Sequence, residues 1–241
     1  MPGQPQGRTP GDARERLLST PITKEVQLLV EGGDDVAFVS AVLAGQPRQA
    51  ARVQVHACGG KQSIRSMLDA LATLLPDTPA RKIVVLRDAD DDAATAEREC
   101  FSYFRQAGYP CPGQAVDDWP EVSANLAGLA TGWLLVPGQG QPGTLETLIL
   151  AALAQDACMD LATGMLTACL GARDKNPAWP GKRAKKHAVT GVAAAEKAKV
   201  QAFLAGFARK GYRLPSSAFE EGVLSPDHAA FDGIRQQLLG L

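Results

Sequence analysis

Acidic residues stand at three places in the chain where an apolar run ends or a helix is expected to begin. One group follows VQLLV, the second follows KIVVLR, and the third lies within PGTLETLIL. The acids are Glu31, Asp34, Asp35, Asp88, Asp90 and Glu146. In open α/β sheets the carboxyl ends of parallel strands form one ligand crevice, so acids that are distant in the sequence can meet there.

Several carboxylates at short range raise one another's pKa unless a positive charge offsets them. Mg²⁺ takes oxygen ligands, keeps several waters, and is usually held by one or two carboxylates together with a substrate phosphate. The acids therefore predict a site for Mg²⁺, with Mn²⁺ as a substitute. In an extended backbone, the period of two would turn Asp88 and Asp90 to the same side, so that both could reach one ion.

Some of these acids also have a purely structural explanation. Asp34, Asp35, Asp91 and Asp92 are each placed where a helix is expected to begin. An acid there can cap the helix or interact with its positive end. Glu146 fits equally well as an acid in the first turn of a helix capped by Thr144. Glu31 has no such explanation, because it lies between an apolar strand and two glycines. Gly32 and Gly33 would allow positive φ and a close backbone approach at the crevice.

Hydrophobic periodicity predicts the elements that position these residues. Strands are expected at residues 26–30, 52–57, 83–86 and 133–136, with helical spacing after the first three. This alternation indicates an α/β, Rossmann-like fold, in which a parallel sheet of about four strands is flanked by helices. Beyond Thr144 the pattern is helical. We expect a flexible leader over residues 1–20, a core over 21–155, and a helical extension over 156–241 that packs on the core.

Composition narrows the class of protein. With 241 residues, 45% of them hydrophobic, the chain can bury one substantial core. The formal net charge is -1, so a contact with nucleic acid has to come from a local basic patch. The five cysteines are never spaced C-x-x-C, which argues against a disulfide framework and a zinc site. No apolar stretch is long enough to span a membrane, so a soluble cytoplasmic protein without a membrane partner is expected.

Basic residues provide two candidate contacts with phosphate. Lys61 follows Gly59 and Gly60 in a turn that does not match G-x-x-x-x-G-K-[ST], so the turn gives no support for ATP binding. The turn could still bring Lys61 and backbone amides close to a phosphate. A basic segment around Trp179 could follow a nucleic-acid backbone, although a solvated loop explains it equally well. Its candidate contacts are Lys182, Arg183, Lys185 and Lys186.

In combination, the motifs resemble those of a Toprim domain. They are E-G-x-x-D from Glu31 to Asp35, D-x-D from Asp88 to Asp90, and L-E at Glu146. Toprim is the metal-binding catalytic domain shared by topoisomerases, bacterial primases, recombination mediators and OLD-type (overcoming lysogenization defect) nucleases. The Gly-Gly-Lys turn and the G-T-L-E helix start make residues 24–155 most similar to small stand-alone OLD-like members.

The resemblance implies roles for the matching residues. The implied metal ligands are Glu31, Asp35, Asp88, Asp90 and Glu146. Glu31 corresponds to a glutamate that binds metal or transfers protons. OLD-type nucleases also use a lysine from a later helix, for which Lys197 or Lys199 is the counterpart here.

Taken together, these features favour an enzyme, a Mg²⁺-dependent endonuclease that hydrolyses phosphodiester bonds in nucleic acid, with DNA favoured over RNA. The ATPase motif of full-length OLD proteins does not occur in the chain, so a separate ATPase is an expected partner by analogy. The alternative is a non-catalytic Toprim module that binds nucleic acid or protein. A phosphohydrolase acting on small molecules is a further alternative.

Overall fold

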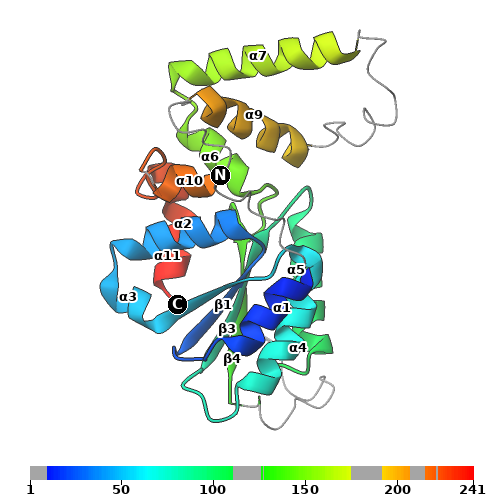
Figure 1. Ribbon diagram of the computed structural model, residues 1–241, viewed down its shortest axis with the longest axis vertical. Coiled ribbons are helices and arrows are strands. Elements are labelled where there is room, and N and C mark those ends of the chain that lie inside the picture. Colours follow the sequence, from blue (N-terminus) through cyan, green and yellow to red (C-terminus); the bar gives the residue numbers. More distant parts are fainter. Residues whose placement is uncertain (1–9, 111–125, 127, 175–191, 207–214, 221) are drawn as a thin grey trace, which may run out of the picture.

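A computed structural model (Figure 1) describes residues 10–110, 126, 128–174, 192–206, 215–220 and 222–241. Its centre is a four-stranded sheet made of β1 (Val26–Val30), β2 (Val53–Ala57), β3 (Lys82–Asp88) and β4 (Ala130–Val136). The strand order is β2-β1-β3-β4, and every pairing is parallel. The predicted α/β class with a four-stranded parallel sheet, as in Rossmann-like folds, is confirmed.

Apolar side chains cover both faces of the sheet. Every residue of β1 is buried, as expected for a central strand of a parallel sheet with helices on both sides. Successive strand residues point to opposite faces. Leu28 and Val84 therefore belong to one core cluster, and their neighbours Leu29 and Val85 to the other.

Three helices pack on the face that carries Leu29. They are α1 (Pro10–Ser19), α4 (Ile64–Leu74), which follows the short helix η1 (Lys61–Ser63), and α5 (Ala93–Gln106). Helix α4 buries Ile64, Met67, Leu68 and Leu71 along one stripe, the spacing that places residues on a single helix face. This stripe is the one that the sequence pattern predicted.

The N-terminal segment differs from the expected flexible leader. Residues 10–19 form α1, which packs against α4, and Leu17 is only 2% exposed. The expectation is wrong for this part because Leu17 gains a buried apolar site on α4, and burial of a leucine offsets part of the cost of ordering a helix. Residues 1–9 lie outside the described part of the chain.

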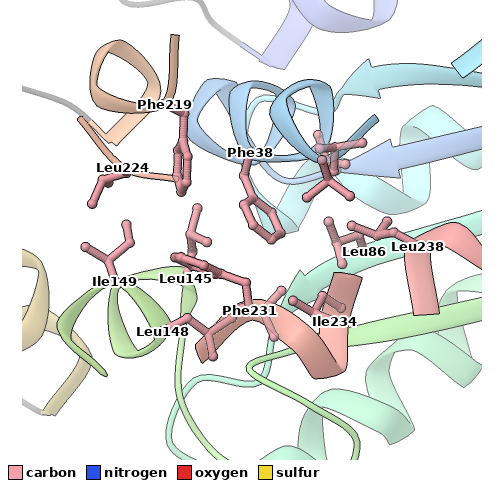
Figure 2. Close-up of a cluster of buried hydrophobic side chains, with 14 of the residues drawn as sticks. Phe38, Leu86, Leu145, Leu148, Ile149, Phe219, Leu224, Phe231, Ile234 and Leu238 are labelled. Atoms are coloured by element: carbon pink, nitrogen blue, oxygen red, sulfur yellow. The ribbon is translucent and has the colours of Figure 1, made fainter. Parts of the chain in front are cut away.

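The opposite face is completed by helices from both ends of the sequence. Helices α2 (Gly33–Ala44) and α3 (Pro47–Arg52) come early, and η4 (Ala229–Phe231), α10 (Pro215–Glu220) and α11 (Asp232–Leu239) come late. Figure 2 shows Phe38 of α2 meeting Phe219 and Phe231. The ring centroid of Phe38 lies 5.4 Å from the ring centroid of Phe219 and 5.4 Å from that of Phe231. The late helices are thus part of the main core.

The remaining helices, α6 (Leu145–Ala152), α7 (Ala157–Asp174) and α9 (Val192–Gly206), lie beyond the carboxyl ends of the strands (Figure 1). Leu145, Leu148 and Ile149 of α6 point into the cluster around Phe231 (Figure 2), which fixes the start of this helix at the edge of the sheet. Helix α9 packs on α6 and α7. Within the described residues, no helix has the length and apolar character needed to cross a membrane.

Candidate functional site

The acids converge on a cleft of about 210 Å³ at the carboxyl ends of β1 and β3. Its charged lining consists of Glu31, Asp34, Asp35, Asp88, Glu146 and Lys197. The structure therefore brings together five of the six acids that the sequence indicated, from the end of β1 and from α2, β3 and α6. Asp90 is the exception.

Glu31 directly follows β1 and is held by the turn after β2. Its carbonyl oxygen accepts hydrogen bonds from the amides of Gly59, at 2.9 Å, and Gly60, at 2.8 Å. These two glycines have φ values of 82° and 118°, which an L side chain rarely adopts. The expected phosphate contact of these amides is not supported, because both already bond to Glu31.

The two glycines after Glu31 do not use the conformational freedom that was expected of them. Gly32 has a φ of -148° and stands just before α2, and Gly33 is not among the described residues with positive φ. Their contribution is the lack of a side chain: both line the cleft, and a Cβ built on Gly33 would meet no atom within 4 Å. The expectation of positive φ is therefore wrong, and the expectation of a close backbone approach stays a prediction.

The carboxyl group of Glu31 is poorly compensated. Its Oε1 is buried without a hydrogen-bond partner in the described structure and lies 3.7 Å from Nε of Arg87. Burial raises the pKa of Glu31, the charge of Arg87 opposes this rise, and the charge of Asp90 adds to it. Glu31 is therefore an acid whose charge the protein offsets only in part.

Asp35 and Asp34 stand in the first turn of α2. Asp35 Oδ2 accepts a hydrogen bond from the amide of Gly32 at 2.8 Å, and Asp34 Oδ1 accepts one from the amide of Ser216 at 3.0 Å. Burial raises the pKa of Asp35 to about 7, against the hydrogen bond from Gly32, with the negative charge of Glu31 adding to the rise. Asp35 thus accepts a hydrogen bond from the backbone at the start of α2, as expected for an acid at a helix start, and it also lines the cleft.

Asp88 ends β3 and connects it to α6. Its Oδ1 accepts a hydrogen bond from the amide of Leu145 at 2.9 Å. Burial raises the pKa of Asp88 well above its usual range, and the charges of Asp35 and Glu31 raise it further. Glu31, Asp35 and Asp88 are therefore three neighbouring acids that resist ionisation together.

The side chain of Asp90 does not lie on the same side of the backbone as that of Asp88. The strand ends at Asp88, and Asp90 adopts a φ of 52°, so the expectation of an extended backbone through both residues is wrong. Its carboxylate pairs with Lys61 Nζ at 2.8 Å and with Arg87 Nη2 at 3.4 Å. Asp90 is not among the residues that line the cleft, and Lys61 is engaged in this ion pair.

Arg87 is a residue of the site that the sequence patterns did not indicate. Its side chain is 1% exposed, and Nη1 lies 2.6 Å from Oε2 of Glu99. Its Nε donates a hydrogen bond to the carbonyl oxygen of Asp88 at 3.0 Å. A signal was present in KIVVLRD, because a charged residue within a buried strand needs partners of opposite charge.

Glu146 and Lys197 close the cleft from the helical side. Glu146 is the second residue of α6, whose N-cap is Thr144. It is 7% exposed. Lys197 of α9 places Nζ 3.5 Å from Glu146 Oε1. Of the two candidate lysines, Lys197 lines the cleft and Lys199 does not, since helix residues two positions apart do not face the same way.

The donor set fits a hydrated divalent cation. Among the described residues, no three His, Cys, Asp or Glu side chains are arranged to hold a metal ion together, so the cleft is not a closed cage of protein ligands. Mg²⁺ does not require one, because one or two carboxylates with water and a substrate phosphate suffice. The raised pKa values of Asp35 and Asp88 fit such an ion, which would offset their charge.

The basic segment proposed to contact nucleic acid falls between the described ranges. Its candidate residues Lys182, Arg183, Lys185 and Lys186 belong to residues 175–191. These candidates lie outside the described residues and stay predictions.

Comparison with known proteins assigns a family to the chain. One family profile matches residues 25–241, which includes the whole sheet, every acid of the cleft and the C-terminal helices, but not α1. No curated protein and no solved structure matches the chain. Since the match covers most of the sequence, the chain belongs to the family described as protein of unknown function (DUF3226).

Proposed function

We propose that the protein is a Mg²⁺-dependent nuclease that hydrolyses phosphodiester bonds, a Toprim-like enzyme similar to the OLD type. One observation carries the proposal: Glu31, Asp35, Asp88 and Glu146 line one cleft together with Lys197. The raised pKa values of Glu31, Asp35 and Asp88 favour a divalent cation, and a nearby lysine suits an anionic substrate. DNA is the favoured substrate, and Mn²⁺ is expected to substitute for Mg²⁺.

Five residues of the cleft have a part in the proposed reaction. Asp35, Asp88 and Glu146 would bind Mg²⁺ together with water molecules. When bound, the ion would polarise a phosphoryl oxygen and lower the pKa of a coordinated water. Glu31 would accept a proton from the attacking water. The P–O bond to the sugar oxygen would break, and that oxygen would take a proton from solvent water as it leaves. Lys197 would offset the negative charge that develops on the phosphoryl oxygens.

Asp90 has a supporting part in this proposal. Its carboxylate would have to leave both Lys61 and Arg87 before it could bind the ion. Its carbonyl oxygen also accepts a hydrogen bond from the amide of Gly143 at 2.7 Å, which holds the loop before α6. We therefore assign Asp90 to fixing the turn that presents Asp88.

Cleavage assays with a matched pair of variants test the proposal. Purified protein is incubated with single-stranded and duplex DNA and with RNA, in Mg²⁺, Mn²⁺ or EDTA. We expect metal-dependent cleavage that Asp88→Asn abolishes and Asp91→Asn preserves, since Asp91 is an exposed acid of the same turn outside the cleft. Cleavage that is absent both with and without a candidate ATPase added, or that survives Asp88→Asn, would contradict the proposal. Activity of the chain alone would remove the need for a separate ATPase.

A non-catalytic module that binds nucleic acid or protein is the second candidate. The observation that favours it is that no three potential ligands in the described part of the chain are already arranged around one ion. This candidate predicts binding of nucleic acid in EDTA that is unchanged by Glu31→Gln and Asp88→Asn. Fluorescence anisotropy with a labelled oligonucleotide measures this binding.

A further inference from the structure

Lys197 brings a positive charge to Glu146, an acid with a largely buried side chain. Its Nζ lies 3.5 Å from Glu146 Oε1, and the side chains are 55% and 9% exposed, respectively. Glu146 stands in the first turn of α6, between Leu145 and Leu148, which are both buried in the core. The lysine, in contrast, has a long and largely exposed side chain. If this pair separates, the lysine is the partner that moves.

The position of α9 does not depend on this ion pair. Thr147 Oγ1 of α6 donates a hydrogen bond to Oε2 of Glu196 at 2.6 Å. Val200, Phe203 and Leu204 of α9 are buried in the main core cluster. Release of Lys197 from Glu146 would therefore leave the helix in place beside the cleft.

A divalent ion in the cleft and the ammonium group of Lys197 would compete for Glu146, because its carboxylate is within reach of both. At about 4 Å, like charges repel by about 1 kcal/mol in water and by more near a protein surface. A divalent ion bound by Glu146 would therefore push away the ammonium group of Lys197. The displaced group would stay tethered at the edge of the cleft, where a substrate phosphate would enter.

We propose that Lys197 is a resident counter-cation of Glu146, which a divalent cation displaces and which then becomes available to pair with a substrate phosphate. This inference rests on the proposed metal site and adds an exchange of partners to it. It predicts that Lys197 weakens metal binding even though it assists the proposed reaction.

Calorimetric titration of Mn²⁺ into the full chain tests the exchange. We expect Lys197→Met to tighten the Kd for Mn²⁺ by about fivefold, the size typical of a partly exposed charge pair. Lys197→Arg should behave like the wild type because it keeps the charge. Lys199→Met is the matched control on the same helix and should change the Kd by less than about twofold. Circular dichroism verifies that each variant is folded.

Repeating the titration in Glu146→Gln protein tests whether the effect of Lys197→Met on Mn²⁺ binding depends on Glu146. In Glu146→Gln protein the two cations no longer share a carboxylate, so adding Lys197→Met should change Mn²⁺ binding much less than it does in the wild-type background. If wild type binds Mn²⁺ and Lys197→Met does not tighten it, or if Lys197→Arg tightens it equally, the exchange is refuted and the metal site stands. If neither wild type nor any variant binds Mn²⁺, the proposed metal site fails as well.

Discussion

Asp35→Asn should stabilise the metal-free protein at alkaline pH, although it replaces a residue of the proposed site. The carboxyl group of Asp35 is enclosed beside other acids, and burial raises its pKa from 3.8 to about 7. Asparagine is uncharged and keeps an oxygen that can accept the hydrogen bond from the amide of Gly32. The substitution therefore removes the unfavourable charge and preserves the contact at the helix start.

The pKa values fix the sign and the size of the effect. Between pH 3.8 and about 7 the folded protein retains a proton on Asp35 that the unfolded chain has lost, so stability falls as the pH rises and the full penalty applies above pH 7. At about 1.4 kcal/mol per tenfold change in proton affinity, the penalty is at most about 4 kcal/mol. We expect Asp35→Asn to recover about 2 kcal/mol, because the residue keeps partial exposure and its acidic neighbours still repel one another.

Urea denaturation in EDTA, followed by circular dichroism, measures this difference. At pH 8 the free energy of unfolding should be about 2 kcal/mol higher for Asp35→Asn than for wild type. At pH 5 the difference should be less than half as large, because only part of the penalty accumulates between pH 3.8 and pH 5. Addition of Mg²⁺ at pH 8 should stabilise wild type more than the variant.

The pH dependence separates this reasoning from a simple packing effect. Asp77→Asn is a suitable control, because Asp77 lies in the exposed turn between α4 and β3, away from the cleft. Equal differences at pH 5 and pH 8, or a loss of stability at pH 8, would refute the idea that uncompensated charge is built into the cleft.

Three further substitutions test the supports of the site, each by urea denaturation against wild type. Arg87→Met should cost about 3 kcal/mol because it leaves Glu31 without its nearby cation, and Glu31→Gln in the same chain should restore part of this loss. Phe231→Ala should cost about 4 kcal/mol because it opens a cavity beside Phe38, whereas Phe231→Leu should cost less. Gly143→Ala should cost about 2 kcal/mol, because Gly143 has a φ of 134° and an added Cβ would lie 2.7 Å from Thr147 Oγ1. Gly33→Ala is the control, and it should cost less than half of that because a Cβ at this position meets no atom within 4 Å.

The amino-acid sequence alone determined the features that depend on neighbouring residues. Apolar runs with turn residues between them predicted all four strands and the α/β class, because alternation and burial leave a period in the sequence. Asp92 caps α5 by accepting a hydrogen bond from the amide of Thr95 at 3.1 Å, and its position before the helix was sufficient to predict this. The convergence of Glu31, Asp88 and Glu146 followed from the geometry of parallel sheets.

The tertiary structure alone decided where individual side chains point and which distant residues meet them. Asp90 leaves the line of β3 because a single residue adopts positive φ, which the D-x-D spacing does not encode. The choice of Lys197 over Lys199 depends on how α9 packs on α6, and the burial of Arg87 on the approach of Glu99 from α5. The contacts of Phe38 with Phe219 and Phe231 join segments more than 180 residues apart. Local periodicity carries no information about such contacts, because they are selected by the packing of the whole core.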